Sequence, residues 1–293
     1  MNRLILIFIV SLICGAVFTG CNSKHEKSSN KKTTWKYDGL TGKGKVKSMR
    51  NVGYTVISDS GQLHKGEIIT DEWGYNNFSI EYTETGLWTE YNSYKPDGSS
   101  IRREISIYDD AGNAVEMQVY NFGTFDHKRV YTNDSRGNII KTIRYTAADS
   151  LVSTIIYKYD ENDNNIKIRR YNAADSLISK TLNKFDKNNN CIESVIYNSD
   201  SSLSSKILNK YNSSGNIIEK IDYNSVGELI TQTAYQYNDK GFLTETNIYN
   251  STDNSNQKTA YEYKYDFNDN WIERIEYIND IAVKITERQI VYY

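Results

Sequence analysis

Aromatic residues recur along this chain with a period of about 26 residues. The anchor positions of this period are Tyr82, Tyr108, Asn133, Tyr159, Phe185, Tyr211, Tyr237 and Tyr265. A tyrosine follows each anchor after twelve residues, at Tyr94, Tyr120, Tyr145, Tyr171, Tyr197, Tyr223, Tyr249 and Tyr277. A weaker copy starts at Ile57, with Ile69 in the twelfth place. Periods in this range are typical of repeat architectures, so we expect one array rather than several unlike domains.

Each repeat predicts a β-hairpin. In one copy, residues 151–159 and 166–171 are rich in β-branched and aromatic residues and predict two strands. Residues 160–164 and 172–176 are rich in Asn, Asp, Ser and Ala, and predict the turns that join the strands. About nine such hairpins follow one another over residues 35–293, which we treat as a single β-hairpin repeat domain.

The alternation of residues along each strand predicts which face of the hairpins is buried. We number the places of a repeat from its anchor, which is place 0. Even places hold the anchors, the tyrosines of place 12, and leucines at place 18 (Leu151, Leu177, Leu203 and Leu229). Odd places hold lysines such as Lys158, Lys184, Lys210 and Lys264. Because side chains alternate along a strand, we expect the even places to share the buried face. Pairing in register then sets the anchor opposite place 6, and place 12 opposite place 18.

The hairpins predict an all-β fold in which one continuous antiparallel sheet curls into a spiral or solenoid. Open twisted sheets seldom exceed about ten strands without curling or splitting. After residue 34 the sequence has no convincing 3.6-residue periodicity, so no helix is expected to cover the apolar face. A flat single-layer sheet that is wet on both faces is the alternative.

The first 34 residues predict an export signal and a tether. Arg3 precedes an apolar run over residues 4–18, which ends at Thr19, Gly20 and Cys21. This pattern resembles a bacterial lipoprotein signal peptide over residues 1–20, in which the cysteine, here Cys21, is lipidated and becomes the mature N-terminus. Residues 21–34 are mostly Ser, Lys and Asn and predict a flexible tether. By resemblance to known sorting signals, Asn22 after the cysteine favours the outer membrane.

The charge balance excludes a nucleic-acid partner. The chain has 35 basic and 37 acidic residues and a net charge of −2 at pH 7. That balance provides neither the basic surface that binds nucleic acid nor a polybasic membrane patch. We therefore expect the membrane to be contacted through the N-terminal lipid.

Several of the turn sequences resemble a known repeat family. Residues 157–160 and 263–266 read Tyr-Lys-Tyr-Asp, and residues 108–113 read Tyr-Asp-Asp-Ala-Gly-Asn. These segments resemble the YD repeat of the RHS family. Residues 42–48 resemble the segment that precedes such repeats in lipoproteins of Bacteroidetes. Large RHS proteins build β-spiral shells around a C-terminal toxin, so the resemblance implies, as an alternative function, an effector shell or a partner that neutralises a toxin.

Few residues stand out as candidates for chemistry. His25, His64 and His127 fall at unrelated repeat places, and we expect them at the surface rather than in a metal or catalytic site. Cys191 occupies place 6, which is otherwise mainly apolar, and predicts a packed core thiol without a disulfide partner in the processed chain. The sequence predicts no catalytic residue, no metal site and no cofactor, and hence no enzyme.

The turns also raise the question of calcium. Residues 160–164, 186–190 and 266–270 share an Asp-x-Asn-x-Asn pattern, which resembles the first half of a calcium-binding loop. Ordinary hairpin turns need the same residues, and the glycine and bidentate glutamate of a calcium loop are missing. We therefore favour simple turns.

Trp73 and Tyr75 lie in a loop that departs from the repeat. Two interpretations remain open: the loop caps an end of the array, or the aromatic side chains contact a glycan or protein ligand. The sequence as a whole predicts a non-catalytic, lipid-anchored repeat protein of the cell envelope that acts as a binding or structural scaffold.

Overall fold

We analysed a computed structural model, which describes residues 35–37 and 40–293. Every regular element in these ranges is a β-strand. The first strands are β1 (Trp35–Tyr37), β2 (Leu40–Gly42), β3 (Val46–Asp59), β4 (Gln62–Ile68), β5 (Asn77–Tyr82), β6 (Trp88–Tyr94), β7 (Ser100–Tyr108), β8 (Ala114–Asn121), β9 (Thr124–Asn133) and β10 (Ile139–Thr146). They are followed by β11 (Leu151–Tyr159), β12 (Asn165–Asn172), β13 (Leu177–Phe185), β14 (Cys191–Asn198), β15 (Leu203–Tyr211), β16 (Ile217–Tyr223), β17 (Leu229–Tyr237), β18 (Leu243–Asn250), β19 (Ser255–Tyr265), β20 (Trp271–Ile278) and β21 (Ile281–Tyr292). The described residues contain no helix that is long and apolar enough to cross a membrane.

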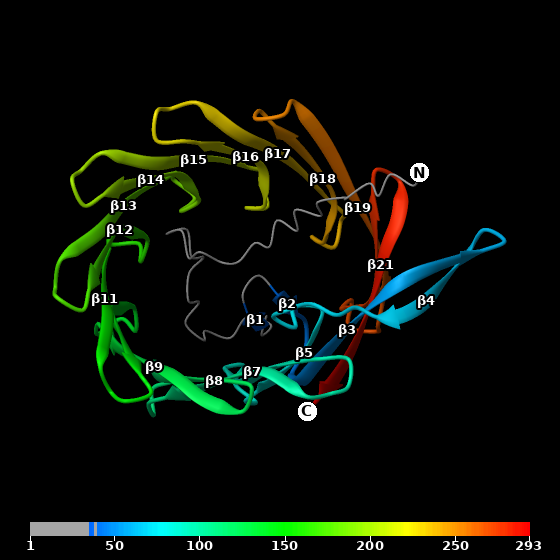
Figure 1. The fold of residues 1–293 in the computed structure, drawn as a ribbon, viewed down its shortest axis with the longest axis horizontal. Helices are drawn as coiled ribbons and strands as arrows, with labels where there is room; N and C mark the ends of the chain where they lie inside the picture. Colours follow the sequence, from blue (N-terminus) through cyan, green and yellow to red (C-terminus); the bar gives the residue numbers. More distant parts are fainter. Residues whose placement is uncertain (1–34, 38–39) are drawn as a thin grey trace, which may run out of the picture.

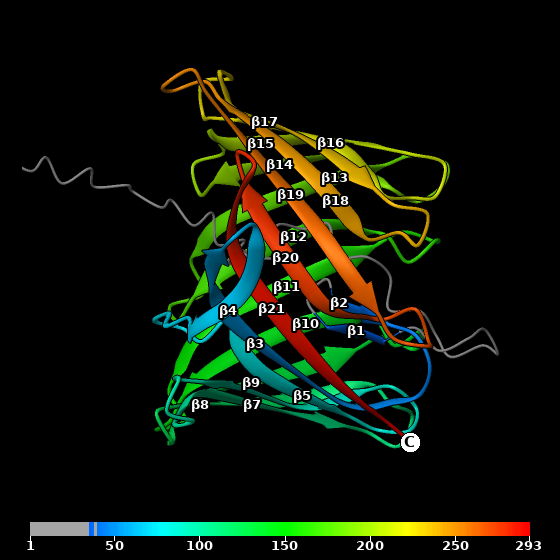
Figure 2. The same ribbon diagram turned by 90° about the vertical axis from the view of Figure 1, so that its right-hand side faces the viewer.

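Eighteen strands, β3 and β5 to β21, form one closed antiparallel barrel (Figure 1). Strands that follow one another in sequence pair as hairpins, and they cross the wall obliquely (Figure 2). Strand β4 is not part of this ring. It pairs with the end of β3, from Tyr54 to Asp59, whereas β5 pairs with the earlier residues 48–52 of β3. The β3–β4 hairpin therefore projects outward from the wall (Figure 1).

The prediction of a spiral or solenoid is wrong, because the two ends of the sheet pair with each other. Strand β21 pairs with β3 from Ile285 opposite Tyr54 to Tyr292 opposite Val46. The hydroxyl of Tyr293 then donates to the carbonyl of Tyr82, 2.6 Å away, across the same seam. Closure removes the two free edges that a spiral would leave unpaired, so the backbone hydrogen bonds are completed around the ring.

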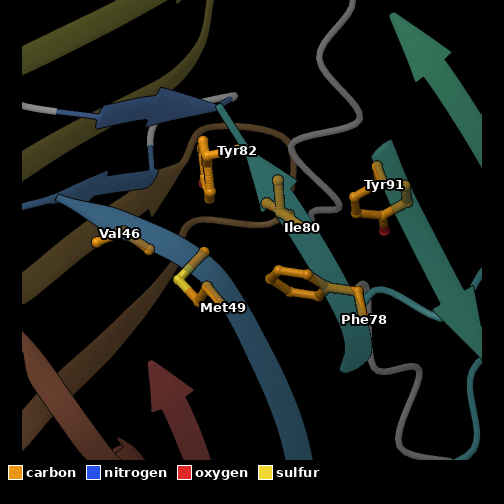
Figure 3. Close-up of a cluster of buried hydrophobic side chains, with 6 residues drawn as sticks. All are labelled: Val46, Met49, Phe78, Ile80, Tyr82 and Tyr91. Carbon is orange, nitrogen blue, oxygen red and sulfur yellow. The ribbon is translucent and has the colours of Figure 1, made fainter. Parts of the chain in front are cut away.

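A compact core lies where the ring closes (Figure 3). It is formed by buried side chains of β3, β5 and β6, namely Val46, Met49, Phe78, Ile80, Tyr82 and Tyr91. Trp88 of β6 and Ile290 and Tyr292 of β21 pack against this cluster. The core therefore includes side chains of β3, β5 and β21, which meet at the seam, and of the neighbouring β6. Burial of apolar side chains thus supports the pairing of residues that are far apart in sequence.

The turns repeat one geometry. Asp160 accepts a backbone hydrogen bond from Asp163 at 3.3 Å and donates one to Asn164 at 3.0 Å. Asp163 has a φ of +61°, and the residues at the same place in later repeats also have positive φ (Asn189, Gly215 and Gly241). A turn followed by a left-handed residue is a common hairpin connection, and it explains the Asn, Asp and Gly of the turn sequences.

A β-bulge follows each of these turns and reverses the parity of the return strand. Tyr159 lies opposite Asn165, as the register predicts, but Lys158 lies opposite Lys167, so Ile166 is an extra residue. The same shift follows Phe185 and Tyr211. The predicted pairing of the anchor with place 6 is therefore confirmed. The predicted assignment of even places to the buried face is wrong for the return strand after place 6.

The tyrosines of place 12 consequently lie on the face opposite to the anchors. Tyr197 faces Lys180 on β13, whose ammonium lies 4.6 Å from the ring centre. The next residue, Thr181, is fully buried and points to the other face, which it shares with the anchor Phe185. The prediction that even places share one face is wrong for place 12, because the bulge shifts the residues of the return strand by one, up to a second register shift at place 12.

The anchor face is the inner face of the barrel. Closing a sheet brings the inward side chains together and spreads the outward ones, so the more buried face is the inner one. Thr181, Ser194 and Ile80 are at most 1 % exposed and all belong to the anchor face. The place-12 tyrosines and the lysines beside them therefore line the outside.

Anchor tyrosines bind backbone carbonyls at the bulges. The hydroxyl of Tyr159 donates to the carbonyl of Ile139 at 3.0 Å, and that of Tyr237 donates to Ile217 at 2.8 Å. Where the anchor is Asn133, its amide donates instead to the carbonyl of Ala114 at 2.8 Å. Burial raises the pKa of Tyr159 to about 12, so its hydroxyl keeps the proton that it donates. The anchors thus serve both packing and hydrogen bonding.

Charged pairs cover the outer face. Lys184 lies directly opposite Glu193, with 2.7 Å between the ammonium and a carboxylate oxygen, and its side chain is 70 % exposed. The same pair recurs in two later hairpins, as Lys210 with Glu219 and Lys264 with Glu273. The outer wall therefore carries paired charges along these strands, beside exposed apolar side chains such as Ile192 and Ile218.

Candidate binding site

The candidate binding loop, residues 69–76, joins β4 to β5, and its shape is set by Asp71. One carboxylate oxygen of Asp71 accepts the backbone N–H groups of Trp73 at 3.1 Å and Tyr75 at 2.7 Å. The other oxygen accepts the backbone and side-chain N–H groups of Asn76, each at 3.0 Å. A short acidic side chain that bonds the following backbone stabilises a turn without regular secondary structure.

The loop is also fixed to the barrel wall. Gly74 has a φ of +69°, and a Cβ at this residue would lie 2.7 Å from the Cβ of Ser93 on β6, so only glycine fits. The side chain of Asn77 accepts from the backbone N–H of Gly53 and donates to the carbonyl of Ile69. These contacts hold both ends of the loop against the wall beside the projecting hairpin.

Trp73 and Tyr75 are each 51 % exposed on this fixed loop. The described strands close into a ring, so an open end of the array for this loop to cap is not present among them. Two half-exposed aromatic rings on a rigid backbone can stack on a sugar ring or insert into a partner surface with little loss of conformational entropy. The contact of Trp73 and Tyr75 with a ligand stays a prediction.

The other residues singled out from the sequence lie apart from this loop. Cys21, the signal peptide 1–20 and the tether 21–34 lie outside the described residues. His64 is exposed on β4, as expected. His127 is not at the surface, because it lies on the inner face of β9 and is 4 % exposed. Burial lowers the pKa of His127, although its hydrogen bond to Asp126 at 2.5 Å opposes that shift.

Cys191 packs on the inner face, where it is 5 % exposed. The buried position is confirmed. The other two cysteines, Cys14 and Cys21, lie outside the described residues, so the expectation that Cys191 has no disulfide partner in the processed chain stays a prediction.

The Asp-x-Asn-x-Asn segments use their oxygen atoms within the turn itself. One carboxylate oxygen of Asp160 accepts the backbone N–H groups of Asn162 and Asn164, each at 2.9 Å, and the other accepts the side chain of Asn164. The side chain of Asn164 also donates to Asn189 in the next turn at 2.9 Å. These bonds join neighbouring turns along one rim of the barrel. Among residues 35–37 and 40–293, no cluster of three or more His, Cys, Asp or Glu side chains is placed to hold a metal ion.

Sequence reasoning missed two arginines on the inner face, Arg274 and Arg288. Arg274 occupies place 9, which is buried in other repeats, as at Ile168 and Ser194. The uncorrected parity assigns this place to the exposed face, where a charged residue draws no attention. Recognition of the bulge would have marked Arg274 as unusual.

No family model and no curated protein matches this sequence. Among solved structures, a porin-like protein from Bacteroides uniformis is similar to the chain with a TM-score of 0.43 and 7 % identity, covering 84 % of this chain and 96 % of that one. A porin-like protein from Bacteroides vulgatus gives a TM-score of 0.36 and 10 % identity over 85 % of this chain and 98 % of that one. The Photorhabdus luminescens Tc holotoxin pore gives 0.35 and 10 % over 81 % of this chain and 14 % of that one. At TM-scores below 0.5, these similarities carry no argument about function.

Proposed function

We propose that the protein is a non-catalytic barrel of the cell envelope, held at the outer membrane by a lipid on Cys21. In this proposal the barrel faces water and serves as a binding or structural scaffold. The exposed aromatic side chains of Trp73 and Tyr75 form its specific contact with a glycan or protein ligand.

The single observation that carries the proposal is the pairing of charges on the outer wall. Barrels that cross membranes present an apolar band to the lipid, and charged side chains there are destabilising. Here the Lys184–Glu193 pair and its repeats at Lys210 and Lys264 lie on the outer face of three hairpins. A wall of this kind favours water on its outside, and a lipid on Cys21 would then provide the membrane attachment that the sequence predicts.

A protease site placed in the tether, residues 21–34, tests this arrangement in the full-length, exported protein. We expect cleavage to release the folded barrel from washed membranes into buffer without detergent. Cys21→Ala should abolish the incorporation of labelled palmitate, whereas Cys191→Ala should leave it unchanged. A cleaved barrel that stays in the membrane fraction until detergent is added would show that its wall contacts lipid.

Trp73→Ala tests the binding loop. In a glycan-array screen of the purified protein, we expect the substitution to weaken any specific binding by over about 1 kcal/mol, roughly fivefold, because exposed tryptophans are frequent binding hot spots. The melting temperature should hardly change, since the side chain is half exposed. Phe267→Ala is the control, because Phe267 is an 87 % exposed aromatic residue in a distant turn. Intact binding together with a large fall in melting temperature would assign Trp73 a structural role instead.

A further inference from the structure

Two arginines lie close together on the inner face where the barrel closes. Arg274 on β20 lies directly opposite Thr286 on β21, and Arg288 is two residues beyond Thr286 on the same strand. Side chains two residues apart on a strand share a face, so Arg274 and Arg288 are diagonal neighbours. The guanidinium carbon of Arg288 lies 3.4 Å from the ring centre of Trp271, and that of Arg274 lies 5.3 Å from the same centre.

Arg288 is buried, and the described residues provide no counter-ion for it. Arg288 is 4 % exposed, and its Nε donates to the side-chain oxygen of Asn51 at 3.0 Å. Within residues 35–37 and 40–293, no carboxylate lies within 4.0 Å of its guanidinium, and its Nη2 is buried without a hydrogen-bond partner. A buried cation in this state is costly unless another group compensates it.

Arg274 adds to this excess of positive charge. Its Nε is also buried without a partner among the described residues. Its nearest carboxylate, Glu276, is 3.9 Å away, and the same oxygen lies 2.9 Å from the ammonium of Lys284. Burial and the neighbouring Arg274 lower the pKa of Arg288 to about 9, so Arg288 is still charged at neutral pH.

We propose that Arg274 and Arg288 form a binding site for an oxyanion, a carboxylate or a phosphate group, inside the barrel. Guanidinium groups recognise such groups because their N–H donors match two oxygen atoms at once, and each arginine has a donor that no described residue binds. The side chain of Arg274 is 28 % exposed, so it forms the side of the site that an anion reaches from the lumen.

Aromatic residues flank the site. Trp271 is 5 % exposed beneath Arg288, and the ring of Tyr261 lies 5.2 Å from the guanidinium carbon of Arg274. Attraction between the cations and these rings holds the guanidinium groups in place before an anion binds. A charge pair formed in such surroundings is screened less by salt than one at the surface.

The site is tested by thermal unfolding of the full-length protein at constant ionic strength, in chloride alone and with increasing phosphate or citrate. A ligand that binds only the folded state raises the melting temperature. We expect at least one of the two oxyanions to raise it by about 2 °C or more at saturation. A rise in melting temperature with phosphate alone indicates a site for phosphate groups, and a rise with citrate alone indicates a site for carboxylates. Either result supports the site.

Three variants locate the response. Arg288→Met and Arg274→Met should each weaken the anion response at least tenfold in apparent affinity, and Arg288→Lys should weaken it less than Arg288→Met. Arg169→Met is the matched control, because Arg169 is an exposed arginine on the outer face of β12, and its response should equal that of the wild type. If Arg288→Met does not fold, Arg274→Met and Arg288→Lys still decide the outcome.

Two results would overturn the proposal. One is an equal melting temperature of the wild type in chloride, phosphate and citrate. The other is an undiminished anion response in Arg274→Met and Arg288→Lys, which would place any bound anion elsewhere. In either case, Arg288 would serve only to stack on Trp271 and to bind Asn51. The outcome does not depend on the lipid at Cys21 or on the loop that carries Trp73.

Discussion

At the scale of single residues, the anchor tyrosines repair the hydrogen bonding that the bulges disturb. A bulge leaves one residue of a strand without a regular partner. The carbonyl of Ile139, at place 6 of its repeat, accepts instead from the hydroxyl of Tyr159 in the next hairpin. The 26-residue spacing therefore reflects both the length of one hairpin and the reach of one side chain.

Tyr159→Phe removes this hydroxyl and leaves the ring in place. We expect a loss of about 1 kcal/mol or more in the free energy of unfolding, because the carbonyl of Ile139 loses its partner in a buried setting. Denaturant titration of the purified protein measures the change. Tyr197→Phe is the control on the outer face and should stay within about 0.5 kcal/mol. Equal losses at both tyrosines would contradict the assignment of the inner face.

The sequence predicts the anchors and their partners at place 6, but not the hydroxyl bonds or the faces. Alternation along a strand holds only while the register is regular, and a bulge has no distinctive residue in this repeat. Ile166, Ile192 and Ile218 occupy the extra position, and isoleucine is equally common in regular strands. For this reason the sequence assigns Tyr197, and not Ser194, to the buried face.

At the scale of strands, not every hairpin has a Lys–Glu pair on its outer face. Lys158 lies opposite Lys167, at the places that Lys184 and Glu193 occupy in the next repeat. Desolvation and then the neighbouring cations Arg169, Lys180 and Lys158 lower the pKa of Lys167. Like charges placed directly opposite each other destabilise a strand pair.

Lys167→Glu converts this like-charge pair into the Lys–Glu pair of the later hairpins. We expect a gain of a few tenths of a kcal/mol, up to about 1, in the free energy of unfolding, which falls as salt is added. Lys167→Gln removes the repulsion without adding an attraction and should give an intermediate value. A loss of stability in the glutamate variant at low salt would show that these side chains do not face each other in solution.

At the scale of the whole molecule, the sequence predicts the hairpins but not their closure. A repeat encodes the contacts of each unit with its neighbours, whereas closure depends on one contact between the two ends. Strands β3 and β21 provide that contact, with Arg288 bound to Asn51 across the seam. The sequence marks Trp73 and Tyr75 because their loop breaks the repeat, and their contact with a ligand stays a prediction. The bulges hide the arginines of the inner face.

The closed ring is the central claim, and a disulfide trap across the seam tests it most directly. Val291 and Ser48 are direct partners on the outer face of β21 and β3, and such pairs have Cβ atoms near the distance that a disulfide needs. In the Ser48→Cys, Val291→Cys double variant, we expect mild oxidation to give a monomeric intramolecular cross-link, seen as faster migration in a non-reducing gel and as a linked peptide in mass spectrometry. The off-register pair of Ile57→Cys with Val291→Cys should not cross-link. No cross-link between residues 48 and 291 in the folded protein, or equal cross-linking of both pairs, would contradict the closed barrel.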